Sequence, residues 1–183
     1  YDWSGQSVSL SEDGTTIAVG SARNSGFTGH VRVFNFDGSN WNQLGVDIDG
    51  ENADDRSGWS VSLSSDGNTV AIGAYNNDGN GTDSGHVRIY NYNGVSWNQL
   101  GNDIDGEAGD LSGSVSLSSD GNTLAIGAEY NSGNGNQSGH VRVYNWDGNS
   151  WNQVGQDIDG AGQYDLMGYS VSLSSDGNIV AIG

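Results

Sequence analysis

The stretch Ser60–Ala74, SVSLSSDGNTVAIGA, decides how the chain is organised, because near-copies of it recur along the sequence. In each copy, two runs of alternating residues flank an Asp-Gly pair, which is the local pattern of a two-residue β-hairpin. The sequence therefore predicts four such hairpins. The other three copies are SVSLSEDGTTIAVGS from Ser7, SVSLSSDGNTLAIGA from Ser114 and SVSLSSDGNIVAIG from Ser170.

The hairpins mark an internal repeat of about 54 residues, because successive hairpin aspartates are 53, 54 and 56 residues apart. Self-similarity at a fixed period is the signature of a repeat architecture. The aspartates are Asp13, Asp66, Asp120 and Asp176. The repeats that follow from them are 1–53, 54–109 and 110–163, with the first hairpin of a fourth repeat at 164–183.

Each repeat holds four strand-like runs, which we call A to D in order. Asp66-Gly67 joins A to B and Asn93-Gly94 joins C to D, and both pairs are turn formers that tolerate positive φ. A long variable loop joins B to C. Four antiparallel strands in a meander, repeated at this period, match one blade of a β-propeller. In the second repeat the runs are Ser60–Ser64, Thr69–Ala74, His86–Tyr92 and Ser96–Ile104.

The strand count predicts an incomplete ring. Three full repeats and one hairpin make 14 strands, whereas closed propellers typically have about 4 to 8 four-stranded blades. The expected fold is thus all-β, a β-propeller-type array of four-stranded antiparallel blades that this chain does not close. We expect the chain to be part of a longer array, and closure with a second copy is the alternative.

The charge of the chain is strongly one-sided. Twenty-three acidic residues against five Arg and no Lys give a net charge of −18, which repels nucleic acid and anionic membranes. No apolar run approaches the length that a membrane span needs. Neither nucleic-acid binding nor membrane insertion is expected. The absence of cysteine excludes a disulfide framework and cysteine-based metal or redox sites.

The stretch SGWSVSLSSDGNTVAIGA from Ser57, followed by SGHVRIYNY from Ser84, resembles the FG-GAP repeat of the integrin α-subunit propeller and its bacterial and algal relatives. The resemblance covers the whole chain. It implies a seven-bladed extracellular propeller used for adhesion or interaction, commonly with Ca²⁺ in the A–B loop.

The chain departs from this family pattern at three places. The proline after Gly-Ala is missing, and the DxDxDG calcium loop is reduced to Glu12-Asp13-Gly14 or Ser-Asp-Gly. Such a loop is too short to wrap an ion that takes about six to eight oxygens, so calcium is not assigned to it. The phenylalanine of the motif is replaced by Ser4, Ser57, Ser112 and Met167.

The B–C loops supply the remaining calcium and glycan candidates. In the second repeat, part of this loop is similar to a DxDxDG loop with two Asn substitutions, but a solvated turn is the favoured interpretation. No cofactor is assigned, and calcium is the candidate to test. Two N-x-S/T sequons suit glycosylation in a secreted eukaryotic protein, with chance occurrence as the rival explanation. The calcium candidates are Asn76, Asp78, Asn80 and Asp83, and the glycan candidates are Asn80 and Asn136.

Several repeated residues are interpreted as structural. The histidines begin strand C in separate blades, so we expect hydrogen bonds across the blade rather than one gathered site. The arginines are expected to stack on tyrosine or pair with an aspartate of the next blade, with an anion-binding ring as the alternative. The tryptophans are expected to pack between blades, with sugar platforms as the alternative. These residues are His30, His86, His140, Arg32, Arg88, Arg142, Trp41, Trp97 and Trp151.

Trp59 and Tyr169 break the repetition, since they stand where the first repeat has Gln6 and where a residue is missing before Ser114. We expect them to be exposed and to contact a partner. No GxSxG, phosphate loop or HExxH motif is present, and a single active site would break the repeat symmetry further. The chain is therefore not expected to be an enzyme.

These observations favour an extracellular or cell-surface structural and adhesive module. Its expected partner is a protein or further copies of the chain itself. A carbohydrate-binding, lectin-like propeller is the alternative, in which exposed tryptophan and Asn or Asp side chains contact a glycan. The non-catalytic part of a larger secreted enzyme is a weaker alternative.

Overall fold

The structure is a computed structural model that describes residues 2–183. It is an all-β array of repeated antiparallel sheets, which confirms the predicted fold class. Three sheets have the same strand order, and a two-stranded sheet follows them.

The first sheet comprises β1 (Ser7–Leu10), β2 (Thr16–Ser21), β3 (His30–Phe36), β4 (Trp41–Gln43) and β5 (Ile48–Asp49). The second comprises β6 (Ser60–Leu63), β7 (Thr69–Ala74), β8 (His86–Tyr92), β9 (Trp97–Gln99) and β10 (Ile104–Asp105). The third comprises β11 (Ser114–Leu117), β12 (Thr123–Ala128), β13 (His140–Trp146), β14 (Trp151–Gln153) and β15 (Ile158–Asp159), and the last comprises β16 (Val171–Leu173) and β17 (Val180–Ile182).

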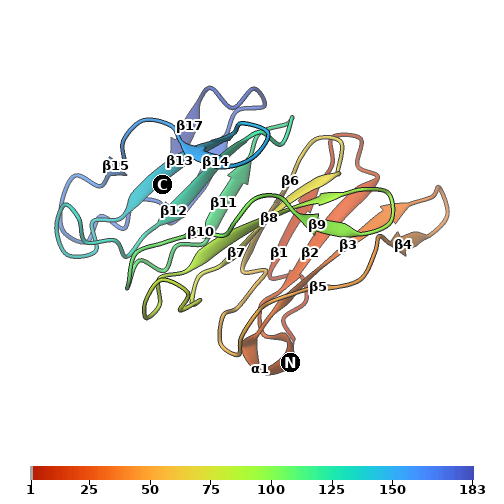
Figure 1. The fold of residues 1–183 in the computed structure, drawn as a ribbon, viewed down its shortest axis with the longest axis horizontal. Helices are drawn as coiled ribbons and strands as arrows, with labels where there is room; N and C mark the ends of the chain where they lie inside the picture. The colour runs from red at the N-terminus through yellow and green to blue at the C-terminus, as the bar shows by residue number, and fades with distance from the viewer. Residues whose placement is uncertain (1) are drawn as a thin grey trace.

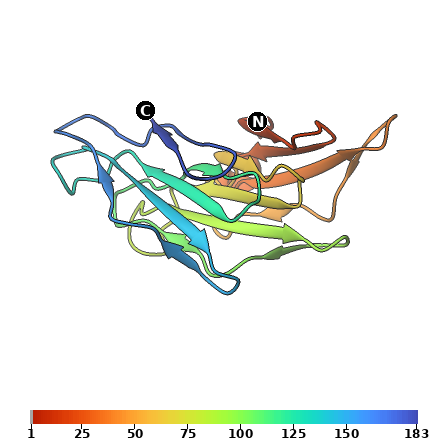
Figure 2. The ribbon, with the colours of Figure 1, turned by 90° about the horizontal axis from the view of Figure 1, so that it is seen from above.

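We call the three complete sheets blades 1 to 3 and the last sheet the C-terminal hairpin. In each blade, strands A, B and C pair in order, and two short strands share the outer position D against strand C. The blades lie side by side (Figure 1) and fan out in an open array (Figure 2). The short segment α1 (Asn24–Phe27), in which Ser25 and Gly26 have positive φ, lies in the B–C loop of blade 1.

The A–B turns are longer than predicted. Between β6 and β7 the Ser64 amide donates to the Thr69 carbonyl at 2.9 Å, with four residues between them. Only Gly67 has a positive φ, of 71°. The prediction of a two-residue Asp-Gly turn is wrong here, because the Asp66 carboxylate holds a wider loop by accepting hydrogen bonds from the Ser64 hydroxyl and the Asn68 amide.

The C–D turns are two-residue hairpins, displaced by one residue from the predicted pair. In blade 2 the Asn93 amide donates to the Ser96 carbonyl at 3.1 Å, so Gly94 and Val95 occupy the centre of the turn. Gly94 has a φ of 93°, as the first central residue of a type II′ turn requires.

Strand D is divided, where the sequence predicts one continuous strand. Gly101, between β9 and β10, has a φ of 81°. A Cβ atom on Gly101 would lie 2.9 Å from the Trp146 ring and 3.2 Å from the Trp151 ring. The strand therefore breaks where tryptophans of the next blade approach its backbone.

Apolar clusters join neighbouring blades. Between blades 1 and 2, side chains of β2, β3 and β5 pack against side chains of β6 and β7, and Trp97 closes the outer edge. The Trp97 indole also donates to the Leu44 carbonyl of blade 1 at 2.9 Å. The facing position in blade 1 has no blade against it among the described residues, and there Val8 and Leu10 are 59% and 57% exposed. The buried members of this cluster are Ala18, Val31, Val33, Ile48, Val61, Leu63, Val70 and Ile72.

The inner strands, which occupy position A, are tied to one another by serine. The Ser9 hydroxyl accepts a hydrogen bond from the Leu63 amide of the next inner strand at 2.9 Å. Ser62 does the same for Leu117, also at 2.9 Å. These hydroxyls satisfy the amides of an otherwise open sheet edge, which explains the alternation of serine and apolar residues in the recurring stretch.

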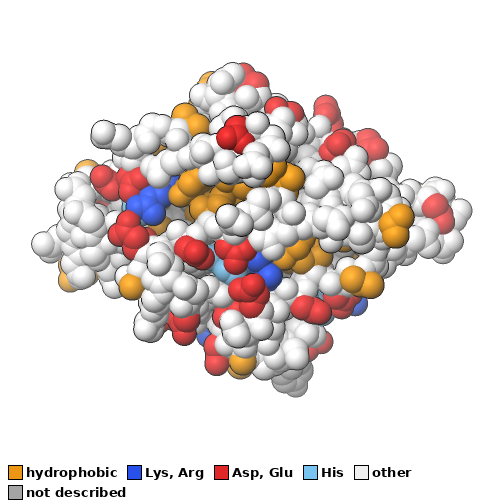
Figure 3. All heavy atoms as spheres, in the orientation of Figure 1, with side chains coloured by type: hydrophobic (Ala, Val, Ile, Leu, Met, Phe, Trp, Pro, Cys, Tyr) orange, Lys and Arg blue, Asp and Glu red, His pale blue; other side chains and the backbone are white. Residues whose placement is uncertain are grey.

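Hydrophobic and acidic side chains are distributed differently over the surface. On the face drawn in Figure 3, hydrophobic side chains gather in bands while acidic side chains are scattered around them. Among the described residues, no helix is both long enough and apolar enough to span a membrane.

Candidate functional site

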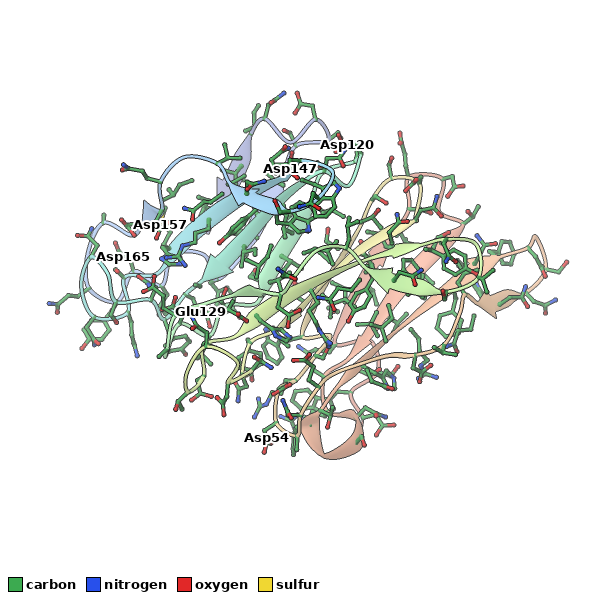
Figure 4. All side chains as sticks on the ribbon, viewed as in Figure 1. Asp54, Asp120, Glu129, Asp147, Asp157 and Asp165 are labelled. Carbon is green, nitrogen blue, oxygen red and sulfur yellow. The ribbon has the colours of Figure 1, made fainter. Side chains whose placement is uncertain are left out.

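The inner strands have two ends with different connections. We call the end that carries the A–B and C–D turns the turn end, and the end that carries the B–C loops and D–A linkers the loop end. In Figure 4, Asp120 and Asp147 mark the turn end near the upper edge, whereas Glu129 and Asp54 lie in the lower half.

A cavity of about 420 Å³ lies at the loop end. Its volume falls in the range of sites that hold a small ligand or a side chain. All three blades and the segment before the C-terminal hairpin contribute to it, so it belongs to the array rather than to one repeat. Its lining residues are Gln6, Trp59, Ser60, Tyr75, Leu111, Ser114, Gly127, Glu129, Tyr130, Gly168 and Tyr169.

The cavity lies where the third repeat is one residue short. Trp59 precedes inner strand β6 and Tyr169 precedes the last inner strand, but no residue fills the corresponding position before Ser114. Ser114 and Gly127 line the cavity at that place. The third repeat thus lacks the residue that would stand between Trp59 and Tyr169, and the cavity lies at this position.

The aromatic side chains that line the cavity differ in their contacts and exposure. Trp59, which was expected to be exposed, is half-buried and packs against Tyr75 with ring centroids 4.5 Å apart and ring planes tilted by 54°. The Arg56 guanidinium donates to the Tyr75 hydroxyl. Tyr169, by contrast, is 70% exposed. The cavity thus combines a packed aromatic pair with an exposed tyrosine.

Among the described residues that line the cavity, Glu129 is the one with a charged side chain. Burial raises the pKa of its carboxyl group, and no other cause contributes. Among residues 2–183, no side chain donates a hydrogen bond to this carboxylate or pairs with it as an ion. A half-buried carboxylate without a partner is energetically costly, so the cavity offers a negative charge that a ligand could satisfy.

A second hollow, of about 300 Å³, lies at the turn end. Each of the four inner strands gives it one leucine, and each A–B turn gives one serine or glutamate. The backbone amides of these turns also bond from blade to blade, for example from Ser65 to the Ser119 carbonyl at 2.9 Å. The lining residues are Leu10, Glu12, Leu63, Ser65, Leu117, Ser119, Leu173 and Ser175.

The A–B turns do not fit a calcium ion. In blade 3, Asp120 Oδ1 accepts from the Ser118 hydroxyl at 2.6 Å and from the Asn122 amide at 3.0 Å, and its Oδ2 accepts from Asn122 Nδ2 at 3.1 Å. The Ser118 hydrogen bond is the main reason why the pKa of Asp120 is lowered. One carboxylate whose oxygens are already engaged is far from the set of about six to eight oxygens that calcium takes.

The histidines face carboxylates instead of making the predicted hydrogen bonds across the blade. His86 Nδ1 lies 3.7 Å from Asp103 of its own blade, and His140 Nδ1 lies 3.6 Å from Asp157. Burial first, and then the neighbouring arginine, lower the pKa of both histidines, which favours neutral imidazoles.

These histidines form three separate groups with acidic residues. In blades 2 and 3 an arginine already neutralises a member of the group: Arg88 lies 3.5 Å from Glu51, and Arg142 lies 2.7 Å from Asp157. The three groups lie in different blades and therefore do not form one site. The groups are His30 with Asp47 and Asp49, His86 with Glu51 and Asp103, and His140 with Asp157 and Asp159.

The arginines differ from their predicted pairing with the next blade. Arg88 and Arg142 pair with Glu51 and Glu107, which belong to the linkers that precede their own blades. Arg88 also lies over the Tyr90 ring, 5.8 Å from its centroid, which agrees with the predicted contact between arginine and tyrosine. Arg32, in blade 1, is half-buried. The arginines thus lie in different blades and do not line one anion site.

The tryptophans that open strand D lie in two environments. Trp97 and Trp151 pack against the preceding blade, and the Trp151 indole donates to the Leu100 carbonyl at 3.0 Å. Trp41 is 48% exposed and contacts Phe36 of its own blade.

The B–C loop of blade 2 is held by its own hydrogen bonds. Asp78 accepts from the Asp83 amide at 2.7 Å, and the Asn80 amide group donates to the Gly106 carbonyl at 2.8 Å. Among the described residues, Asp78 and Asp83 do not form a close group with a third Asp, Glu or His side chain. A glycan on Asn80 would replace its hydrogen bond to Gly106, whereas the exposed Asn136 side chain makes no such bond among residues 2–183.

The structure brings Trp59 and Tyr169 into one cavity, but sequence reasoning missed Tyr75, Glu129 and Tyr130. A signal was present in the repeat. The position just after strand B is Ala22, Tyr75 or Glu129 in successive repeats, so it varies as strongly as the position before strand A.

Comparisons with known proteins agree with the fold. Residues 46–90 match the family model of the FG-GAP repeat, which confirms the resemblance stated from the sequence. No curated protein sequence matches the chain.

Solved propeller structures superpose on almost the whole chain. A proposed 6-phosphogluconolactonase from Bacteroides uniformis has a TM-score of 0.62 at 16% identity, covering 94% of this chain and 45% of its own. Hydrazine synthase from Kuenenia stuttgartiensis has a TM-score of 0.58 at 14% identity, covering 96% and 57%. TolB from Acinetobacter baumannii has a TM-score of 0.56 at 15% identity, covering 96% and 36%. The chain therefore spans about a third to just over half of these structures, and at such identities they show the fold alone.

Proposed function

We propose that this array of propeller blades, which contains an FG-GAP repeat, is a non-catalytic interaction module of a cell-surface or extracellular protein. The observation that supports the proposal is the loop-end cavity, because it gathers the residues at which the repeats differ. FG-GAP repeats are typical of extracellular proteins. In this proposal the blades provide a scaffold, and the loop end holds a protein partner.

The chemistry of the cavity favours binding over catalysis. Its lining has one carboxylate and no histidine, cysteine or lysine, so it lacks a base paired with a nucleophile. Aromatic side chains supply large contact areas at a low cost in conformational entropy, and they are enriched at the centres of protein interfaces.

A carbohydrate-binding module is the second candidate. Trp59 and Tyr169 provide flat apolar surfaces in a cavity that also holds Gln6, Ser60 and Ser114. Such a mixture of aromatic and hydrogen-bonding side chains also suits a sugar ring.

One selection experiment tests both candidates. The intact chain is immobilised and offered to a random peptide library and, separately, to an array of defined glycans. We expect peptides to be enriched, and to lose binding to Tyr169→Ala while still binding Trp41→Ala, whose tryptophan is exposed outside the cavity. Glycan binding that Tyr169→Ala removes, without peptide enrichment, would replace the proposal with the lectin candidate. Binding to neither would overturn both.

A further inference from the structure

We propose that the loop-end cavity takes a basic side chain of the partner, with Glu129 as its counter-ion and Trp59, Tyr75, Tyr130 and Tyr169 as its aromatic surroundings. This inference rests on the proposed function and specifies the chemistry of the partner. Nothing in the repeat pattern requires a carboxylate at position 129, where the other repeats have alanine or tyrosine.

The first argument is the isolated charge. Every other residue that lines the cavity is uncharged, and no hydrogen bond or ion pair within residues 2–183 stabilises the Glu129 carboxylate. Elsewhere in the chain, half-buried carboxylates have partners, such as Asp157 with Arg142 at 2.7 Å. An ammonium or guanidinium group would give Glu129 the partner that the protein does not provide.

The second argument is the aromatic lining. The negative face of an aromatic ring attracts a cation that lies within about 6 Å of its centre, most strongly for tryptophan and tyrosine. Four such side chains line this cavity. The Arg56 guanidinium lies over the Tyr75 ring at 5.3 Å and donates to its hydroxyl, but Arg56 does not line the cavity. Among the described residues, no cation lies over the Trp59, Tyr130 or Tyr169 ring.

The third argument is the charge of the whole chain. At −18, the protein attracts a basic partner over several ångströms and repels an acidic one, which raises the association rate. A neutral sugar could also accept or donate hydrogen bonds in the cavity, but it would leave the charge of Glu129 uncompensated. The charge of Glu129 thus favours a cation over a saccharide.

The experiment is an NMR titration of the intact, ¹⁵N-labelled chain with Nα-acetyl-lysine methylamide. The neutral, nearly isosteric Nα-acetyl-norleucine methylamide is titrated in parallel, and methyl glucoside serves as the saccharide probe. The indole N–H signal of Trp59, assigned with the variant Trp59→Phe, reports on the cavity. We expect saturable shifts with the lysine compound, with Kd roughly in the millimolar range that suits so small a probe, and weaker binding at high salt.

Two variants with the same change of charge make the test specific. Glu129→Gln should weaken lysine binding by roughly fivefold or more, whereas Asp54→Asn, at an exposed position outside the cavity, should leave it unchanged. Equal binding of lysine and norleucine compounds, or lysine binding that Glu129→Gln leaves intact, would overturn the inference. So would shifts at Trp59 with methyl glucoside alone.

The two proposals can fail separately. If the peptide selection enriches neutral or acidic peptides that still require Tyr169, the module binds a protein but this inference is wrong. If no peptide or glycan is enriched while the lysine compound binds as expected, the cavity chemistry holds and the proposed function fails.

Discussion

At the turn end of the inner strands, the hollow is lined by equivalent residues from every repeat, namely a leucine and a serine or glutamate. At the loop end, the cavity is lined by residues that differ from repeat to repeat. Both ends belong to the same inner strands. The backbone is hydrogen-bonded between successive repeats at the loop end as well, for example from the Ser57 amide to the Thr28 carbonyl at 3.0 Å. The difference therefore lies in the side chains, which repeat at the turn end and vary around the loop-end cavity.

The hydrogen bonds show the same contrast. At the turn end, the amides of successive A–B turns bond from blade to blade, and each turn aspartate accepts several hydrogen bonds. At the loop end, the buried Asp55 and Asp110 carboxylates also accept hydrogen bonds, from Asn77 and Asn131, but the Glu129 carboxylate in the cavity accepts none from residues 2–183. We therefore expect substitutions at the turn end to change stability and substitutions at the loop end to change binding.

The largest effect on stability is expected for Trp97→Ala. Its indole fills the space between blades 1 and 2 and donates to the Leu44 carbonyl, so truncation should destabilise the fold by about 3 kcal/mol. Chemical denaturation measures the loss. Trp41→Ala is the matched control, since Trp41 is 48% exposed and has no preceding blade among the described residues. Equal losses in the two variants would contradict the assignment of Trp97 to inter-blade packing.

A smaller effect is expected for Asp120→Ala. The carboxylate accepts three hydrogen bonds within its turn, and their loss should cost about 1 kcal/mol at this exposed position. Asp120→Asn keeps a carbonyl acceptor and should cost less.

A calcium chelator should leave the melting temperature of the chain unchanged, because the hydrogen bonds of the turn engage the aspartate without an ion. A lower melting temperature in the presence of the chelator would show that calcium contributes to stability.

Acid should weaken the fold by protonating aspartates whose pKa the fold lowers. The Ser174 hydrogen bond lowers the pKa of Asp176 to about 2, and the Arg142 hydrogen bond lowers the pKa of Asp157 to about 2, both from 3.8. Because the folded state holds these groups ionised, their stabilisation is present above about pH 4 and is lost as the pH falls from 4 towards 2. Thermal melts across this range measure it. A melting temperature that stays constant from pH 5 to pH 2 would contradict these pKa shifts.

Glu129 should behave in the opposite way. Burial raises its pKa, so its ionised form disfavours the folded state at neutral pH, and this cost disappears as the pH falls to about its unfolded value of 4.5. Glu129→Gln should therefore melt slightly higher than the parent chain at pH 7 and at the same temperature at pH 4. A variant that melts lower at pH 7 would mean that Glu129 has a partner inside the fold.

The smallest change in stability is expected for Tyr169→Ala. The side chain is 70% exposed, and removing it should change the free energy of unfolding by less than about 0.5 kcal/mol. Binding of the selected peptides should nevertheless be lost. A large loss of stability would place Tyr169 in the packing of the array instead.

Most of the fold could be predicted from the sequence, because the repeat places apolar residues at fixed positions and marks every turn with glycine. The errors were local. Asp66-Gly67 has the composition of a two-residue turn, but the hydrogen bonds from Ser64 and Asn68 that widen it depend on side-chain geometry. The break in strand D depends on Trp146 and Trp151 of the next blade, which no local pattern of strand D reveals.

The candidate site could be predicted only in part. Trp59 and Tyr169 attract notice because they interrupt the repetition, whereas Glu129 lies in a different part of its repeat, just after strand B. That these positions meet follows from the antiparallel pairing of strands A and B, which brings the start of one to the end of the other. The pairing of His86 with Asp103 was missed for a similar reason, since strands C and D meet only in the folded blade.

The most direct test of the account measures peptide binding and melting temperature together, for Tyr169→Ala at the loop end and Asp120→Ala at the turn end. The account predicts that Tyr169→Ala keeps its melting temperature and loses the selected peptides, while Asp120→Ala melts lower and binds them as the parent does below its melting point. The reverse pattern, with binding lost at the turn end and stability lost at the loop end, would contradict it.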